Sequence, residues 1–234
     1  MTYAKRQYLK FLPLWVAVVP LVTINISYLV AVGTGHLPAC IPYLSGCTSV
    51  SATGRVSPES LIFKAGMLLS AVAFALLWQL TATFLQTGGR RPSRGLLTRL
   101  RFLRVFSLLA ALSLTLYGVT LGIQGDEFRL LRRIGINGFA ISNLLTQVLF
   151  IVLYRPLRIE ETRKLFRWLL GFCIALPLLG IAAELAKWLG TPRSPTNNLV
   201  AWNAFVALSA YYAVVARIWW HHGIALGRAA SPSE

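Results

Sequence analysis

The stretch FLPLWVAVVPLVTINISYLVAVG, residues 11–33, has 23 residues and no charged side chain. A helix needs about 20 mostly apolar residues to cross the hydrocarbon core of a membrane, so this stretch is long enough to span one. Lys5, Arg6 and Lys10 precede it, as in a secretory signal peptide, but the apolar part of such a peptide is only about 7–15 residues long. We therefore expect residues 11–33 to form an uncleaved transmembrane helix.

Five further apolar stretches of similar length follow the first. The six predicted spans are residues 11–33, 62–86, 102–123, 136–154, 168–189 and 199–220. Charged residues make up only 13% of the 234 and apolar residues 56%, whereas a soluble domain has about 25% charged residues. The sequence therefore predicts an all-α fold class, a polytopic membrane bundle of six transmembrane helices that forms a single domain over residues 1–234.

The net charge of +16 has an explanation in the same topology. With the N-terminus inside, the inner segments hold 14 Lys and Arg and the outer segments hold 5. This bias predicts cytoplasmic termini, with residues 221–234 as a short cytoplasmic tail, and an integral multi-pass protein of the plasma (inner) membrane if the source is bacterial. Because this topology accounts for the positive charge, we expect no nucleic acid as a partner. Arg129, Arg132 and Arg133 oppose the trend, because they lie on an outer connection.

The first outer loop, residues 34–61, contains two of the three cysteines. Cys40 and Cys47 form a disulfide if the outer side is an oxidising compartment, and otherwise they are two free thiols. Cys173 lies inside the fifth span, where we expect a small buried apolar residue. The chain has no HExxH, CxxC or paired acidic motif, so we predict no metal site and no cofactor.

The end of this loop has two readings. Ser57 is a suitable helix N-cap, with Pro58 at the first helical position and Glu59 in the first turn, so helix capping alone explains these residues. The other reading is a direct functional role. His36, Ser51 and Glu59 are the residue types of Ser–His–acid acyl chemistry and are weak catalytic candidates, because no Gly-x-Ser-x-Gly turn accompanies them. Whether the protein is an enzyme stays undecided.

The same loop carries a family pattern. The residues that form it are Pro42, Ser45, Ser51, Gly54, Pro58, Glu59 and Phe63. Placed between a first and a second span, they resemble the signature of the DRAM/Frag/SFK-like membrane proteins. That family includes damage-regulated autophagy modulators and proteins that remodel the lipid of GPI anchors. The resemblance implies six spans and a role in handling membrane lipid. Family members often have Glu-Trp at the start of the last span, where this chain has Ala201-Trp202, followed by Asn203.

Polar residues inside the spans are costly and are therefore candidates for function. Asn143 and Gln147 are four residues apart and share one helix face, which predicts either hydrogen bonds between helices or a polar cavity for a lipid headgroup. Glu184 either pairs with Lys187, three residues on, or faces such a cavity. Glu59, Asn143 and Asn203 lie at similar depth in the outer leaflet, so we expect them to face one another.

The favoured hypothesis is a membrane protein that binds a membrane lipid at the outer leaflet and remodels or regulates it. Its predicted lipid-binding residues are Ser51, Gly54, Glu59, Asn143, Gln147, Glu184, Trp202 and Asn203. One alternative is a non-catalytic regulator or scaffold that uses the basic inner loops. A third alternative is a small-solute transporter. It is disfavoured, because the sequence shows no signal of inverted repeats with broken helices. Gly118 and Gly122 form a GxxxG pair, which indicates either packing within the bundle or the seam of a homo-oligomer.

Overall fold

The computed structural model describes residues 9–87, 93–157 and 159–222. The long helices are α2 (Leu12–Gly33), α4 (Glu59–Thr87), α5 (Arg94–Thr120), α6 (Asp126–Tyr154), α7 (Arg163–Trp188) and α8 (Arg193–His222). The short elements are α3 (Pro42–Ser45) and the 3-10 turns η1 (Val50–Gly54), η2 (Arg155–Leu157) and η3 (Glu160–Thr162). Six helices are long and apolar enough to cross a membrane, and the described residues contain no strand, so the predicted fold class is confirmed.

Several helices extend beyond the predicted spans. α5 begins at Arg94 rather than at residue 102, because Ser93 caps it by accepting a hydrogen bond from the Leu96 N–H (3.2 Å). α6 begins at Asp126 rather than at residue 136, and Asp126 and Glu127 occupy its first turn, where acidic side chains favour a helix N-terminus. Hydropathy identifies only the part of a helix that lies in lipid, so the predicted spans did not include these polar first turns.

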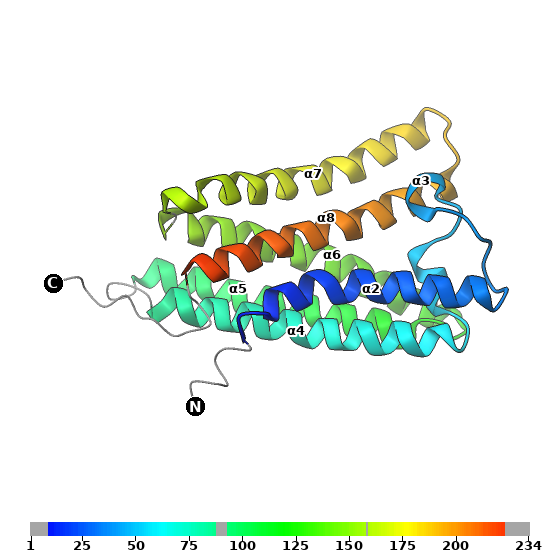
Figure 1. Ribbon diagram of the computed structural model, residues 1–234, viewed down its shortest axis with the longest axis horizontal. Coiled ribbons are helices and arrows are strands. Elements are labelled where there is room, and N and C mark those ends of the chain that lie inside the picture. The colour runs from blue at the N-terminus through cyan, green and yellow to red at the C-terminus, as the bar shows by residue number, and fades with distance from the viewer. Residues whose placement is uncertain (1–8, 88–92, 158, 223–234) are drawn as a thin grey trace.

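The helices run along the long axis of the molecule (Figure 1). The pairs α2/α4, α4/α5, α5/α6, α2/α8 and α7/α8 pack on one another, whereas α7 has little contact with α6. α5 and α6 approach backbone to backbone at Gly135, where a Cβ would lie 2.7 Å from the Tyr117 nitrogen. Small residues permit such an approach between membrane helices. α7 therefore lies at one edge of the bundle, held mainly by α8.

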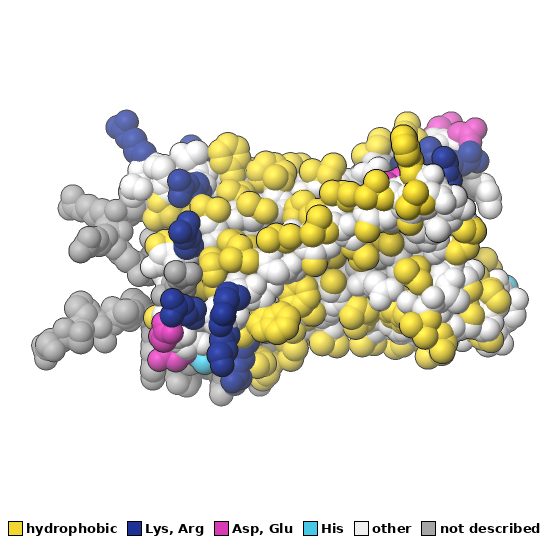
Figure 2. Space-filling view, turned by 90° about the horizontal axis from the view of Figure 1, so that it is seen from above, with side chains coloured by type: hydrophobic (Ala, Val, Ile, Leu, Met, Phe, Trp, Pro, Cys, Tyr) yellow, Lys and Arg dark blue, Asp and Glu magenta, His cyan; other side chains and the backbone are white. Residues whose placement is uncertain are grey.

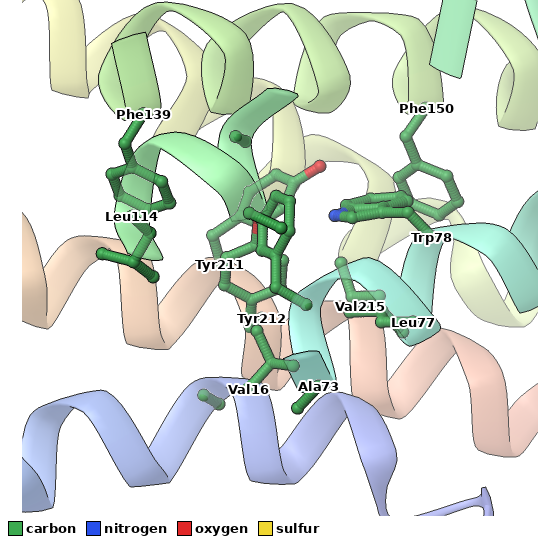
Figure 3. Packing of buried hydrophobic residues seen from close by; sticks show 14 of the residues in the cluster. Val16, Ala73, Leu77, Trp78, Leu114, Phe139, Phe150, Tyr211, Tyr212 and Val215 are labelled. Carbon is green, nitrogen blue, oxygen red and sulfur yellow. The ribbon is translucent and has the colours of Figure 1, made fainter. Parts of the chain in front are cut away.

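Large aromatic side chains fill the centre. Trp78 and Tyr212 are buried, and their ring centroids lie 6.2 Å apart (Figure 3). The outside is also apolar: Figure 2 shows hydrophobic side chains along the length of one face, with Lys and Arg toward its ends. An apolar exterior of this extent is a surface for lipid rather than for water.

The first and the last long helix define one end of the helical bundle. Trp220 Nε1 donates to the Lys10 carbonyl oxygen (2.8 Å), so α2 begins and α8 ends at the same end (Figure 1). We call this the inner end, since the distribution of Lys and Arg predicts that it faces the cytoplasm. Of the predicted tail 221–234, His221 and His222 belong to α8, and the remainder lies outside the described residues. The basic residues Lys5, Arg6, Arg90, Arg91, Arg158 and Arg228 also lie outside them.

The GxxxG pair contacts elements of its own chain. A Cβ at Gly118 would lie 3.5 Å from Met67 Cβ, and one at Gly122 would lie 2.5 Å from the Arg55 carbonyl oxygen. Gly122 thus permits a close approach between the end of α5 and the first outer loop, whereas a side chain at Gly118 would make only an ordinary contact with α4. A homo-oligomer through this pair stays a prediction.

Candidate functional site

The first outer loop folds back over the outer end of the bundle. Cys40 and Cys47 form a disulfide with Cα atoms 6.7 Å apart, which closes a ring around α3. The Tyr28 hydroxyl, from α2, donates to the Cys40 carbonyl oxygen (2.8 Å) and accepts from the Cys40 N–H (2.9 Å). The loop is therefore attached to α2 at one side of its ring.

α8 holds the other side of the loop by hydrogen bonds to its backbone. Trp202 Nε1 donates to the Thr48 carbonyl oxygen (2.9 Å), and Asn203 Nδ2 donates to the Tyr43 carbonyl oxygen (2.9 Å). Asn25 Nδ2 donates to the Tyr43 hydroxyl (2.7 Å). Burial raises the pKa of Tyr43, so this hydroxyl stays protonated at neutral pH. Trp202 and Asn203 thus anchor the loop; that they bind lipid stays a prediction.

Gly54 packs closely against neighbouring side chains. It is buried in η1, and a Cβ there would lie 2.5 Å from Phe63 Cγ and 2.8 Å from Leu121 Cδ2. The predicted cap at Ser57 is wrong, because the Val56 carbonyl oxygen accepts the Ser60 N–H (2.8 Å) and α4 begins at Glu59. Through the contacts of Gly54, η1 packs between α4 and the end of α5.

Glu59 is buried beneath the loop. Its side chain is 1% exposed and its Oε1 lies 2.8 Å from His36 Nδ1, whose ring is 35% exposed. The other oxygen, Oε2, is buried and has no hydrogen-bond partner among the described residues. His36 Nδ1 also lies 3.0 Å from Thr34 Oγ1. The pair forms a polar contact between the end of α2 and the start of α4.

Ser51 is not part of that pair. Its Oγ lies 3.1 Å from Ser49 Oγ and accepts a hydrogen bond from an Arg55 guanidinium nitrogen (3.2 Å). In the described part of the chain no hydrogen bond joins Ser51 to His36 or Glu59. The three weak catalytic candidates therefore do not form a Ser–His–acid arrangement.

A cavity of about 750 Å³ opens at the outer end of the bundle. Its walls come from η1, the turn between α5 and α6, the start of α6 and the start of α8. We call it the outer cavity. Its polar lining includes Ser51, Arg55, Arg129, Arg132, Arg133 and Asn197. Four arginines thus meet in one concave site, three of them the residues that oppose the positive-inside trend.

The arginines of the outer cavity differ in their hydrogen-bond and ion-pair partners. Arg132 donates to two backbone carbonyl oxygens, those of Thr120 (3.1 Å) and Ile123 (2.8 Å). Arg129 pairs with Asp126 (3.1 Å), and both of these side chains are exposed. Arg133 is exposed and has no hydrogen bond or ion pair with any described residue. The cavity consequently carries an excess of positive charge.

An apolar groove of about 410 Å³ runs between α6, α7 and α8. We call it the lateral groove. Its lining includes Asn143, Leu144, Gln147, Leu176, Pro177 and Leu208. Ile136, Ala201 and Phe205 line both the outer cavity and the lateral groove, so the two hollows adjoin at these residues.

Asn143 and Gln147 share the inward face of α6, as their spacing predicts. Asn143 Oδ1 accepts a hydrogen bond from the Tyr212 hydroxyl (2.6 Å), which joins α6 to α8. Gln147 is fully buried, and its Oε1 lies 3.6 Å from Cys173 Sγ. The two side chains form the polar floor of an otherwise apolar groove.

Several predicted site residues lie apart from both hollows. Glu184 is exposed on α7 and pairs with Lys187, which also donates to Asn197 Oδ1 (3.0 Å). Among the described residues no hydrogen bond joins Glu59, Asn143 and Asn203, and each of them has a different partner from the loop or from α8. Conversely, sequence reasoning missed the arginines as site residues. Their conflict with the positive-inside rule was the available signal.

The fold and the two adjoining hollows define a class: a polytopic α-helical membrane protein with a cationic cavity and an apolar groove at its outer end. The family model described as the Frag1/DRAM/Sfk1/Cwh43P N-terminal domain matches residues 8–189. The chain belongs to this family, which confirms the resemblance carried by the loop motif. No curated protein and no solved structure matches the chain. The family match ends before α8, the helix that anchors the loop and lines both hollows.

Proposed function

We propose that the protein binds a membrane lipid from the outer leaflet and remodels or regulates it. The observation that carries this proposal is the junction of the outer cavity with the lateral groove at Ile136, Ala201 and Phe205. A lipid has the same two parts in the same order, a polar headgroup and apolar chains. The cavity would hold the headgroup while a chain lies in the groove.

The depth of the two hollows supports this arrangement. The arginines belong to the first turns of α6 and to the loop, at the level of the headgroups. The groove lies further along α6 and α8, alongside α7, at the level of the chains. Because α7 contacts α6 only slightly, the groove lies between two helices rather than inside a closed core.

The geometry supports binding more directly than a reaction. Chains that move from lipid into an apolar groove exchange one apolar environment for another, so the groove positions the chain without distinguishing one headgroup from another. The polar end therefore decides which lipid is held. Since Ser51, His36 and Glu59 are not assembled, the arrangement favours a protein that selects or regulates a lipid.

A groove-filling substitution tests the proposal. Ala204 lines the lateral groove, and Ala204→Phe fills it. We expect the purified parent to retain lipid through detergent washing, and Ala204→Phe to retain about tenfold less, by mass spectrometry of the intact protein, which corresponds to about 1.4 kcal/mol. Ala182→Phe is the matched control, because Ala182 is exposed on α7 outside the groove.

Two results would contradict the proposal. One is a parent protein that retains no lipid. The other is equal retention by the parent and Ala204→Phe when both fold. Either would favour the regulator or scaffold that acts through its basic inner loops.

A further inference from the structure

We propose that the outer cavity selects lipids whose phosphate-containing headgroup carries a net negative charge, with Arg55 and Arg133 as its principal contacts. This inference rests on the proposed function and specifies the class of lipid. It comes from the charge balance of the cavity, from the donors left free in it and from the position of the arginines.

The charge balance comes first. Four guanidinium groups line the cavity, and Asp126 pairs with only one of them, Arg129. In the described residues no carboxylate lies within ion-pair distance of Arg55, Arg132 or Arg133. The buried carboxylate of Glu59 is taken by His36 and does not line the cavity. A ligand with a net negative charge would supply the missing counter-charge.

The free donors point to phosphate. A guanidinium presents several N–H groups in a planar fork that matches the oxygens of a phosphate. Arg55 uses one nitrogen on Ser51 Oγ, and Arg133 uses none on the described residues, so both retain donors for a ligand. Arg132 is fixed by two neutral carbonyl oxygens, which orient it and leave its charge uncompensated.

The position of the arginines adds an independent argument. Arg55 comes from the loop, whereas Arg132 and Arg133 come from α6, so two separate elements bring cations to one hollow. In a zwitterionic headgroup a cation balances the phosphate charge, whereas a net anionic headgroup keeps a negative charge that no cation of its own balances. Each arginine near a membrane surface contributes about 1 kcal/mol toward an anionic lipid, which is about fivefold in affinity.

The experiment uses the full chain in detergent micelles. Phosphatidylglycerol and phosphatidylcholine with identical chains are the probes, and binding is measured by mass spectrometry of the intact protein. We expect the parent to prefer phosphatidylglycerol by about tenfold or more, as several arginines at about fivefold each imply. Arg133→Gln should lower that preference by about fivefold, and the double variant Arg55→Gln/Arg133→Gln should abolish most of it.

Arg193→Gln is the matched control. Arg193 is exposed at the outer start of α8 and does not line the cavity, so its substitution removes the same charge from the same side of the molecule. We expect this variant to keep the parent's preference. An equal loss in Arg193→Gln and Arg133→Gln would overturn the inference, because it would assign the preference to the surface as a whole.

Further arms separate this inference from the proposed function. If the parent binds both lipids equally and Ala204→Phe still weakens both, the charge selection fails and lipid binding stands. If neither lipid binds, the proposed function itself fails. Glycerol 3-phosphate, which has the phosphate without the chains, should compete poorly. If glycerol 3-phosphate competes with the same affinity as the lipid, the chains play no part in binding. That result would overturn the inference that the phosphate belongs to a lipid.

Discussion

Single residues of the loop motif are explained by packing and burial. Gly54 is the position where η1 meets α4 and α5, and its missing side chain leaves room for the Phe63 ring. Glu59 places a carboxylate under the loop, with His36 as its partner. Both residues therefore lie where the loop meets the helices, although neither lines the outer cavity.

A single methyl group tests the role of Gly54. Gly54→Ala places a Cβ 2.5 Å from Phe63 Cγ, so the ring or η1 must shift. We expect a loss of about 1–3 kcal/mol of stability, which is typical of overpacking in a filled core. Thermal unfolding in detergent measures it. Gly33→Ala is the control, because a Cβ at Gly33 meets nothing within 4 Å. Equal melting temperatures for both variants would contradict the packing role.

The start of the last span differs from the pattern that the family resemblance implies. The resemblance implies an acid beside Trp202, where this chain has Ala201. In the structure Ala201 lies at the junction of the outer cavity and the lateral groove. A small uncharged side chain there leaves the arginines without an added counter-charge and leaves the junction open.

At the scale of elements, the loop and α8 act as one unit. The disulfide closes the loop around α3, and Trp202 joins it to α8 through the Thr48 carbonyl oxygen. The Trp202 ring also packs edge-on against Tyr28 and Tyr43. α8 is therefore one of the elements that position the loop wall of the outer cavity.

Trp202→Phe tests this attachment, because it keeps an aromatic ring and removes the indole N–H. The Thr48 carbonyl oxygen is then left unpaired in a buried site, at a cost of about 1–3 kcal/mol. We expect the loop to open more often and the Cys40–Cys47 disulfide to be reduced about fivefold faster or more, as about 1 kcal/mol implies.

The rate is measured by trapping the released thiols after addition of a water-soluble reductant. Trp188→Phe serves as the comparison, since Trp188 lies at the end of α7 and is 92% exposed. If Trp202→Phe and the parent are reduced at the same rate, the indole hydrogen bond does not hold the loop.

At the scale of the whole molecule, six crossings place the start of α2 and the end of α8 on one side. The 14 Lys and Arg of the inner segments, against 5 in the outer ones, predict that this side faces the cytoplasm. The predicted orientation puts the outer cavity and the disulfide on the opposite side, which suits a disulfide if that compartment is oxidising. The orientation thus agrees with the chemistry of both ends.

Cysteine labelling tests the orientation. In a Cys173→Ala background, Thr191→Cys on the outer connection should react with a membrane-impermeant maleimide in intact cells. Glu161→Cys on the inner connection should react only after the cells are permeabilised. Both positions are exposed, so access depends on the side of the membrane. The reverse pattern would invert the topology and place the outer cavity in the cytoplasm.

The sequence by itself determined the number of spans, the helical class and the family. These properties follow from local rules, because a backbone in hydrocarbon must satisfy its own hydrogen bonds over about 20 consecutive apolar residues. The loop motif is likewise contiguous, so its members could be read in order. The spacing of Asn143 and Gln147 was enough to place both on one helix face.

Only the tertiary structure decided which polar residues meet. The sequence predicts similar depth for Glu59, Asn143 and Asn203, but in the structure they bind His36, Tyr212 and the Tyr43 backbone respectively. Hydropathy gives the depth of a residue, which is one coordinate. The rotation of each helix and the path of the loop depend on close packing between distant segments, as at Gly54 against Phe63. That packing brings Arg55 to the arginines of α6 and leaves the lateral groove beside them.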